Sequence, residues 1–314
     1  MLPFSFFDAH CDTLSCCTHL GWNMADSPGH TDLRRGAEFA HYAQVFAIFH
    51  DGAKPPIDGM LAECGRQAQM FRTQLALNED KMMQCRTAED LERAAAEHKT
   101  AAMLSVEGAE LLECDPGRLD FASELGVKLI NLTWNRANAL SGSNLEERGW
   151  GLSEQGKAFV KRAQSLDILM DVSHLSDPGF WDLMDITEKP VVASHSNSRS
   201  LCGHSRNLTD EQFLAICSCG GYAGINLCPA FLTEHGKPDY ETIYAHMDHF
   251  LQLGSGHVAL GGDLDGISSL PAGITGVHDY EKLASFLEQK GLPEAAIQNI
   301  YSNTMKKVVT LCTM

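Results

Sequence analysis

Eight short apolar segments, separated by stretches long enough for helices, constrain the fold of this chain most strongly. Four of them run into a side chain that can bind a metal ion, and these cover residues 6–12, 101–107, 168–174 and 191–195. The other four cover residues 42–49, 127–133, 222–227 and 257–260. Apolar runs of this length with few polar interruptions are typical of strands that are buried on both faces.

The alternation of strands and helices predicts an α/β fold, a single (β/α)8 TIM-type barrel. Helix signals lie between the strands: a capping box begins at Thr209, Asp177 reads as a cap before Pro178, and residues 292–311 read as one long amphipathic helix. A doubly wound sheet is the alternative, but its glycine-rich phosphate motif does not follow the first strand. Without a linker or a repeat, residues 1–314 are expected to form one domain.

Composition excludes several classes of protein. The formal net charge of -17 argues against binding to nucleic acid, which requires clustered Lys and Arg. No apolar stretch approaches the ~20 residues that cross a bilayer, so no membrane anchor is expected. The eleven cysteines are expected to be reduced thiols, and no signal peptide is expected because Met1 runs almost directly into the first strand. These observations together predict a cytoplasmic protein.

Five potential metal ligands lie at the ends of four predicted strands. They are His10, Asp12, Glu107, His174 and His195. The carboxyl ends of barrel strands meet at one rim, where the active sites of such barrels lie. Three imidazoles and two carboxylates exceed the three protein ligands of one catalytic zinc, and they suit two ions with a bridging carboxylate.

The chain order suggests how the two ions would share these ligands. Glu107 comes from a strand between the two other groups and is expected to bridge, with His10 and Asp12 on one ion and His174 and His195 on the other. Zinc fits imidazole and carboxylate ligands best, while manganese, iron and cobalt stay open.

Two further residues point to chemistry at the same rim. Asp263 follows the last strand within Gly261–Gly266 and could move a proton from metal-bound water to a leaving amine, with Asp265 as a capping or turn aspartate. Arg206 could bind a substrate carboxylate with two hydrogen bonds, although an arginine in a loop is often a surface ion pair.

These motifs together resemble the membrane dipeptidase (renal dipeptidase) family of binuclear zinc peptidases, within the amidohydrolase-like barrels. The matching segments are Asp8–Asp12, Val106–Gly108, Asp171–His174, Ser194–Ser196, Ser205–Asn207 and Gly261–Gly266. The resemblance implies two zinc ions as cofactors, with the five ligands divided as above. It also implies that Arg206 binds the substrate's C-terminal carboxylate and that Asp263 lies near the bridging water.

One position departs from the family pattern. Where kidney-type members carry a histidine that contacts substrate, this chain has Trp134, followed by Asn135. Trp134 offers one N–H donor and an apolar wall, so it cannot act as an acid or as a ligand. The zinc ion, Asn135 or another group is therefore expected to stabilise the oxyanion, with Trp134 and Asn135 both at the substrate site.

The resemblance implies a zinc-dependent dipeptidase in which a dizinc-bridging hydroxide attacks the peptide bond of dipeptides, including those with a C-terminal D-residue. Asp263 and Glu107 are the expected catalytic residues. Another binuclear metal amidohydrolase, acting on a carboxylate-bearing N-acyl amino acid or lactam, is the alternative, and a non-catalytic barrel is a third. The expected partner is a small dipeptide substrate, and a homodimer stays open.

Overall fold

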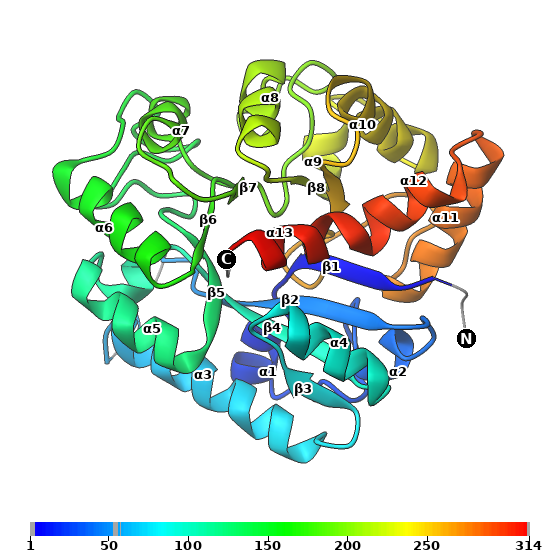
Figure 1. Cartoon of the computed structure of the whole chain (residues 1–314), viewed down its shortest axis with the longest axis horizontal. Helices are drawn as coiled ribbons and strands as arrows, with labels where there is room; N and C mark the ends of the chain where they lie inside the picture. Colours follow the sequence, from blue (N-terminus) through cyan, green and yellow to red (C-terminus); the bar gives the residue numbers. More distant parts are fainter. Residues whose placement is uncertain (1–3, 53–55, 57, 313–314) are drawn as a thin grey trace.

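A parallel barrel forms the centre of the computed structural model, which describes residues 4–52, 56 and 58–312 (Figure 1). The hydrogen-bonded strand order is β7-β6-β5-β4-β2-β1-β9-β8. Hydrogen bonds from Ala193 N to Tyr222 O (2.9 Å) and from Gly224 N to Ala193 O (2.8 Å) join the two ends of this path. The expected (β/α)8 barrel is therefore confirmed, and its strands are β1 (Phe6–Cys11), β2 (Tyr42–Phe49), β4 (Thr100–Glu107), β5 (Val127–Asn131), β6 (Leu169–Asp171), β7 (Val191–Val192), β8 (Ala223–Ile225) and β9 (Val258–Leu260).

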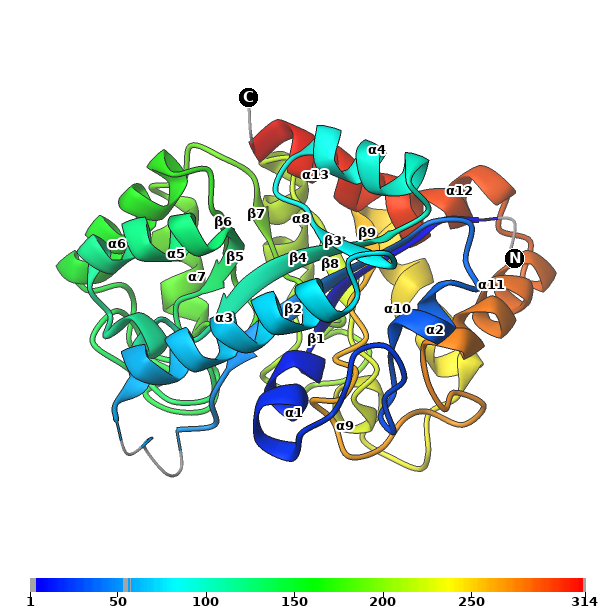
Figure 2. The same cartoon turned by 90° about the horizontal axis from the view of Figure 1, so that it is seen from below.

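Helices surround the barrel on its outer side (Figures 1 and 2). Figure 2 shows α4 and α13 at the end where the strands begin, and α1 and α9 at the opposite end. The helices are α1 (Thr13–Leu20), α2 (Leu33–Gly36), α3 (Met60–Leu77), α4 (Ala88–Ala96), α5 (Leu119–Leu125), α6 (Glu154–Ser165), α7 (Asp177–Met184), α8 (Asp210–Ser218), α9 (Pro229–Leu232), α10 (Tyr240–Leu253), α11 (Tyr280–Gln289), α12 (Glu294–Gln298) and α13 (Thr304–Cys312). Short 3-10 turns cover Ala109–Leu112, Pro116–Arg118 and Val277–Asp279.

Apolar packing closes the barrel at the end where the strands begin. Phe7, Val45 and Met103 are buried in one cluster with Met305 and Val308 of α13. The polar side chains at the carboxyl ends of the strands therefore face the other end of the barrel, which is open.

The structure differs from the sequence-based expectations in three elements. A ninth strand, β3 (Met82–Gln84), pairs in parallel with residues 100–102 of β4 and was not predicted, because three residues show no recognisable period. Ser176, not Asp177, caps α7: its hydroxyl accepts from Gly179 N. Asp177 instead forms an ion pair with Arg199 at 2.7 Å.

The last helix is the third difference. The expected helix over residues 292–311 is interrupted by a π-helical turn, Asn299–Asn303. This turn carries Tyr301, whose ring packs against Phe4 and Phe6 and whose hydroxyl donates to Tyr280 O at 2.7 Å. Tertiary packing at this position therefore overrides the regular helical period.

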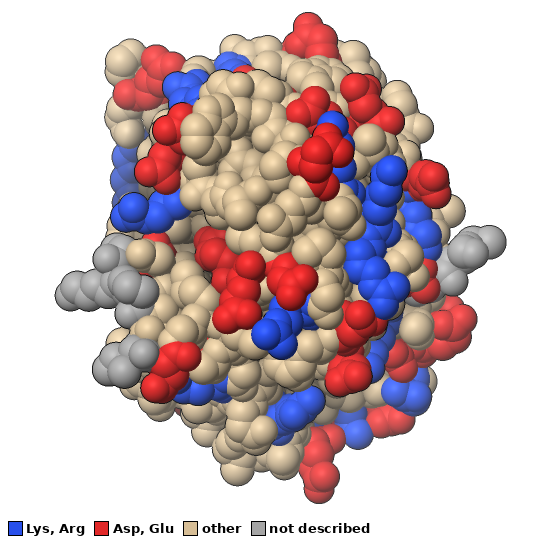
Figure 3. Space-filling model, turned by 90° about the vertical axis from the view of Figure 1, so that its left-hand side faces the viewer, with Lys and Arg blue, Asp and Glu red and all other residues tan. Residues whose placement is uncertain are grey.

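Charged side chains of both signs lie on the face of the molecule that Figure 3 shows. On the face shown in Figure 3, acidic side chains flank a short band of Lys and Arg, so no large field of one sign forms there. Among the residues that the structure describes, no helix combines the length and apolar character needed to cross a lipid bilayer. All eleven cysteines are free thiols.

Candidate metal centre and active site

The structure brings the five predicted ligands together at the open end of the barrel. His10 lies on β1 and Glu107 ends β4, while His174 and His195 follow β6 and β7 by three residues each. His10 Nε2 lies 3.6 Å from Asp12 Oδ2, and the Nε2 atoms of His174 and His195 are 3.1 Å apart. Residues far apart in the chain thus form one cluster, as their positions at strand ends predict.

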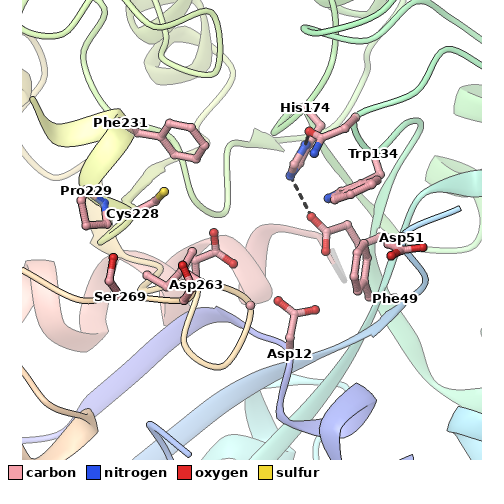
Figure 4. A pocket seen from close by; sticks show the side chains of 15 residues that line it. Asp12, Phe49, Asp51, Trp134, His174, Cys228, Pro229, Phe231, Asp263 and Ser269 are labelled. Atoms are coloured by element: carbon pink, nitrogen blue, oxygen red, sulfur yellow. Dashed lines mark hydrogen bonds and ion pairs between the residues drawn. The ribbon is translucent and has the colours of Figure 1, made fainter. Parts of the chain in front are cut away.

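Glu107 lies between the two histidine groups. Its Oε2 is 3.3 Å from His10 Nε2, and its Oε1 is 2.9 Å from His174 Nε2 and 3.4 Å from His195 Nε2. The dashed line in Figure 4 marks the contact between His174 and this carboxylate. Each oxygen therefore faces a different set of nitrogens, which is the geometry required of a carboxylate shared by two cations.

Two atoms of the cluster are buried without a hydrogen-bond partner, namely His10 Nε2 and Asp12 Oδ1. An unsatisfied buried polar atom costs free energy, so natural proteins rarely retain one without a reason. His10, Glu107 and His195 form one group in which the ligand atoms lie within 4.8 Å of one another, and His10, Asp12 and Asp263 form a second. Imidazole nitrogens and carboxylate oxygens at this spacing fit divalent transition-metal ions.

Hydrogen bonds orient two of the imidazoles. His174 Nδ1 lies 2.9 Å from Asn135 Oδ1, and His195 Nδ1 lies 2.6 Å from Ser194 Oγ. Because an amide oxygen only accepts, Nδ1 of His174 carries the proton and its Nε2 lone pair faces the cluster. Such outer partners set the tautomer and the direction of metal-binding histidines.

Two buried aspartates that the sequence analysis did not assign hold the strand ends in place. Asp8 Oδ1 accepts from the backbone N–H groups of His10 (3.0 Å) and Gly262 (3.1 Å). Asp171 Oδ1 accepts in the same way from Ser173 (2.9 Å) and Ser194 (3.0 Å). Each carboxylate thus ties a ligand-bearing segment to its neighbour, and the sequence signal is an aspartate inside an apolar run just before a histidine.

Burial shifts the acid–base properties of the cluster. Burial lowers the pKa of both His174 and His195 well below its usual value, so both rings are neutral and able to bind a cation. Burial also raises the pKa of Glu107 and of Asp263. For His10, burial lowers the pKa, but Glu107 and Asp12 outweigh it and raise the pKa well above the usual value. Carboxylates held this close favour a nearby positive charge.

Asp263 faces the His10 side of the cluster. Its Oδ1 is 4.0 Å from His10 Nε2, and its Oδ2 accepts from Asn226 Nδ2 at 3.1 Å. Asp263 has φ 57°, and His174 has φ 72°, so both adopt a left-handed conformation that is uncommon outside glycine. At both positions the surrounding contacts must hold this conformation.

Arg206 lies behind the cluster and is 4% exposed. Its Nη1 donates to Ser196 Oγ (3.1 Å) and its Nη2 to His195 O (3.3 Å), while the guanidinium lies 5.4 Å from the Phe231 ring centroid. The buried Nε of Arg206 has no partner. The alternative of a surface ion pair is therefore wrong, and a buried cation with an unused donor points to an anion as its ligand.

A cavity of about 450 Å³ opens above the cluster and is lined by the predicted ligands Asp12, Glu107 and His174. Figure 4 shows Phe49 and Trp134 on one side and Cys228, Pro229 and Phe231 on the other. The Trp134 and Phe49 rings pack edge to face at 5.0 Å. The full lining comprises Asp12, Phe49, Asp51, Glu107, Trp134, Asn135, His174, Cys228, Pro229, Phe231, Asp263, Gly266, Ile267, Ser268 and Ser269.

The cavity contains Trp134 and Asn135, as expected of substrate-site residues, but Arg206 does not line it. Asn135 also holds His174, a role that its position in the sequence did not suggest. Phe49, Cys228, Phe231 and the loop 266–269 are lining residues that the sequence analysis missed, since apolar and small residues after a strand carry no distinctive signal.

Comparison with known proteins agrees with this geometry. A dipeptidase, tcpJ of Claviceps purpurea (strain 20.1), is 26% identical over 297 residues, covering 90% of this chain and 69% of that protein. A metallo peptidase from Rhodobacter sphaeroides, solved with a phosphinate mimic of the dipeptide L-Ala-D-Ala, has a TM-score of 0.88 and 25% identity, covering 98% and 99% of the two chains. The metallo peptidase called dipeptidase AC, of family M19, has a TM-score of 0.89 and 26% identity over 98% of each chain.

A family model extends this similarity to nearly the whole sequence. The model of the membrane dipeptidase family (peptidase family M19) matches residues 1–311. The predicted metal ligands gather at the open rim of the barrel, a cavity lies above them, and the family model matches nearly the whole sequence. The chain therefore belongs to the membrane dipeptidase family of metal-dependent dipeptidases.

Proposed function

We propose that this metal-dependent dipeptidase uses two zinc ions, held by His10 and Asp12 on one side and by His174 and His195 on the other, with Glu107 shared. The observation that carries the proposal is the position of Glu107, whose two oxygens face His10 and the His174–His195 pair respectively. When bound, such a pair of ions supplies positive charge for the developing oxyanion and lowers the pKa of the attacking water.

The protein's own residues would supply the proton transfer. Asp263 lies at the edge of the cluster beside His10 and lines the cavity, with one carboxylate oxygen held by Asn226. We propose that the other oxygen takes the proton of the attacking water and delivers it to the nitrogen of the leaving amine. Its pKa, which burial raises, is suited to a group that must both accept and release a proton.

We propose that Arg206 recognises the free carboxylate of the substrate. The guanidinium is buried beside His195 and beneath Phe231, and its Nε has no partner within the protein. Arg206 does not line the cavity itself, but its guanidinium lies against Phe231, which does. Trp134 and Asn135 are proposed to form the opposite wall of the substrate site, where Asn135 keeps His174 in place.

The experiment is a screen of dipeptides with zinc-loaded protein and a chelator control. L-Ala-L-Ala is compared with L-Ala-D-Ala, whose mimic binds to the Rhodobacter sphaeroides metallo peptidase. Hydrolysis of free dipeptides and none of the corresponding dipeptide amides is expected, because the amides lack the carboxylate. If the amides are cleaved equally well, or if the Arg206→Ala variant keeps its kcat/KM for free dipeptides, the carboxylate-binding role is wrong.

Metal analysis of the purified protein tests the count and identity of the ions, for which two zinc ions per chain are expected. A cytoplasmic location and a homodimer stay predictions from the sequence.

A further inference from the structure

We propose that Asp265 is a positioning residue for the metal centre and sets the separation of Asp12 and Asp263. Asp265 binds neither a predicted metal nor substrate. It acts through Thr13 and His30, which connect three segments of the open rim. The inference rests on the proposed roles of Asp12 and Asp263 and adds to them a residue that holds them in register.

The side chain of Asp265 is 1% exposed and both of its oxygens are used. Oδ2 accepts from Thr13 Oγ1 at 2.6 Å, and Oδ1 accepts from the backbone N–H of His30. In return, Asp265 N donates to His30 Nδ1 at 3.0 Å. One buried carboxylate therefore joins the start of α1, the loop that contains His30 and the loop that follows β9.

Thr13 and Asp265 each lie within two residues of a carboxylate of the proposed metal centre. Thr13 directly follows Asp12, and Asp265 lies two residues after Asp263. A second connection runs beside the first, since Asp12 N donates to Leu264 O at 2.9 Å. Two hydrogen bonds in parallel thus fix the loop of Asp263 against the segment of Asp12, and the hydroxyl of Thr13 contributes one of them.

The backbone at Gly266 is packed closely against the carboxylates of Asp12 and Asp263. A Cβ atom on Gly266 would lie 2.1 Å from Asp12 Oδ2 and 2.6 Å from Asp263 Oδ1. The backbone of this loop therefore touches both carboxylates at once, so a shift of the loop would move them or collide with them. Asp265 itself has φ 66°, a strained conformation that its hydrogen bonds must maintain.

Two conservative variants test the proposal. Thr13→Val removes the hydroxyl while keeping the shape, and Asp265→Asn removes the charge while keeping the size. We expect each to weaken zinc binding and to lower kcat by about 10–100-fold, the usual effect of losing an outer partner of a metal site. KM should change by less than about threefold, because the residue does not touch substrate. Thr13→Ser should restore both zinc affinity and kcat.

The matched control is a similar threonine and aspartate pair at the opposite end of the barrel. Thr87 and Asp90 cap α4 with reciprocal hydrogen bonds, and Asp90 also accepts from Arg86 N. Thr87→Val and Asp90→Asn should lower the melting temperature and leave zinc affinity and kcat unchanged. Zinc affinity is measured by competition with a zinc-binding chromophore, and folding by circular dichroism.

One outcome would contradict the role of Asp265, and a different one would contradict the proposed ligand set. If Thr13→Val and Asp265→Asn lower only the melting temperature, as the controls do, Asp265 is merely structural. Should Asp265→Asn fail to fold, Thr13→Val and its rescue by serine still decide the question. If His10→Ala leaves zinc affinity unchanged, the proposed ligand set fails instead.

Discussion

Glu107 is the residue on which the two halves of the metal centre converge. One of its oxygens faces His10 and the other faces His174 and His195. Glu107→Gln keeps the shape but removes the charge, and an amide presents only one oxygen. We expect a loss of zinc affinity greater than the roughly 10–100-fold that loss of an outer partner costs. Metal titration and kcat/KM for a dipeptide measure this.

Glu110→Gln is the control, because Glu110 is a partly buried glutamate that accepts from Asn138 Nδ2 at 2.9 Å outside the metal cluster. It should bind zinc with the same stoichiometry and affinity as the unmodified protein. Equal zinc affinity in the Glu107→Gln variant would contradict the bridging role.

Asn135 offers a second test at the scale of one side chain. Its Oδ1 accepts from His174 Nδ1, so Asn135→Ala should leave this ring free to rotate. We expect about 10–100-fold weaker zinc binding or turnover, and recovery with Asn135→Asp, which keeps an acceptor oxygen. If zinc affinity recovers in the aspartate variant, Asn135 acts by orienting His174. If only a substrate contact of the amide were lost, the aspartate would not restore zinc affinity.

The residues of the metal cluster could be selected from the sequence because each follows an apolar run that has no packing reason to end in a polar group. What the structure adds is that these side chains meet, with each potential ligand atom 2.9 to 3.6 Å from a neighbouring one. Other features had no such signal. The burial of Arg206 beneath Phe231 and the link between Asp265 and Thr13 depend on loop conformation, which local sequence patterns do not determine.

For single elements, the start of a helix was predictable where one local side chain forms the N-cap hydrogen bond. Thr209 begins α8 with a capping box in which its hydroxyl accepts from Gln212 N, as its sequence predicts. Ser176 replaced Asp177 as the cap of α7 because Arg199 occupies the aspartate. Local patterns thus fail where a distant partner competes for the same side chain.

Thr209→Ala tests the energetic contribution of one cap. Loss of a hydroxyl cap costs about 1 kcal/mol, so we expect the free energy of unfolding to fall by this amount while dipeptide hydrolysis is retained. Denaturant titration measures it, and Thr209→Ser serves as the control that keeps the hydroxyl. A Thr209→Ala variant as stable as the unmodified protein would show that α8 is held by packing alone.

For the molecule as a whole, the metal centre joins segments that lie far apart in the chain. His10, Glu107, His174 and His195 come from four strands of one barrel. A ligand that binds only the folded state stabilises it, by about 2.7 kcal/mol at a free concentration one hundred times its Kd. Bound zinc should therefore raise the melting temperature, and a chelator should lower it.

Differential scanning fluorimetry with and without zinc measures this shift, and His10→Ala is the control that should respond less. If chelation leaves the melting temperature of the unmodified protein unchanged, the ions do not bridge the strands as proposed. The barrel itself was predictable from eight buried runs, whereas β3 and the π-helical turn were not, because they are set by contacts with β4 and with the aromatic rings near Phe6.

The walls of the cavity and its base are built from different kinds of segment. The predicted metal ligands sit at or just beyond strand ends, whereas Phe231 lies on α9 and Ile267 and Ser268 lie on the loop that follows β9. Connections of this kind accept insertions and replacements far more readily than buried strands do. Descendants of this chain could therefore change which amino acids they accept by altering these few positions, while inheriting the hydrolytic apparatus intact.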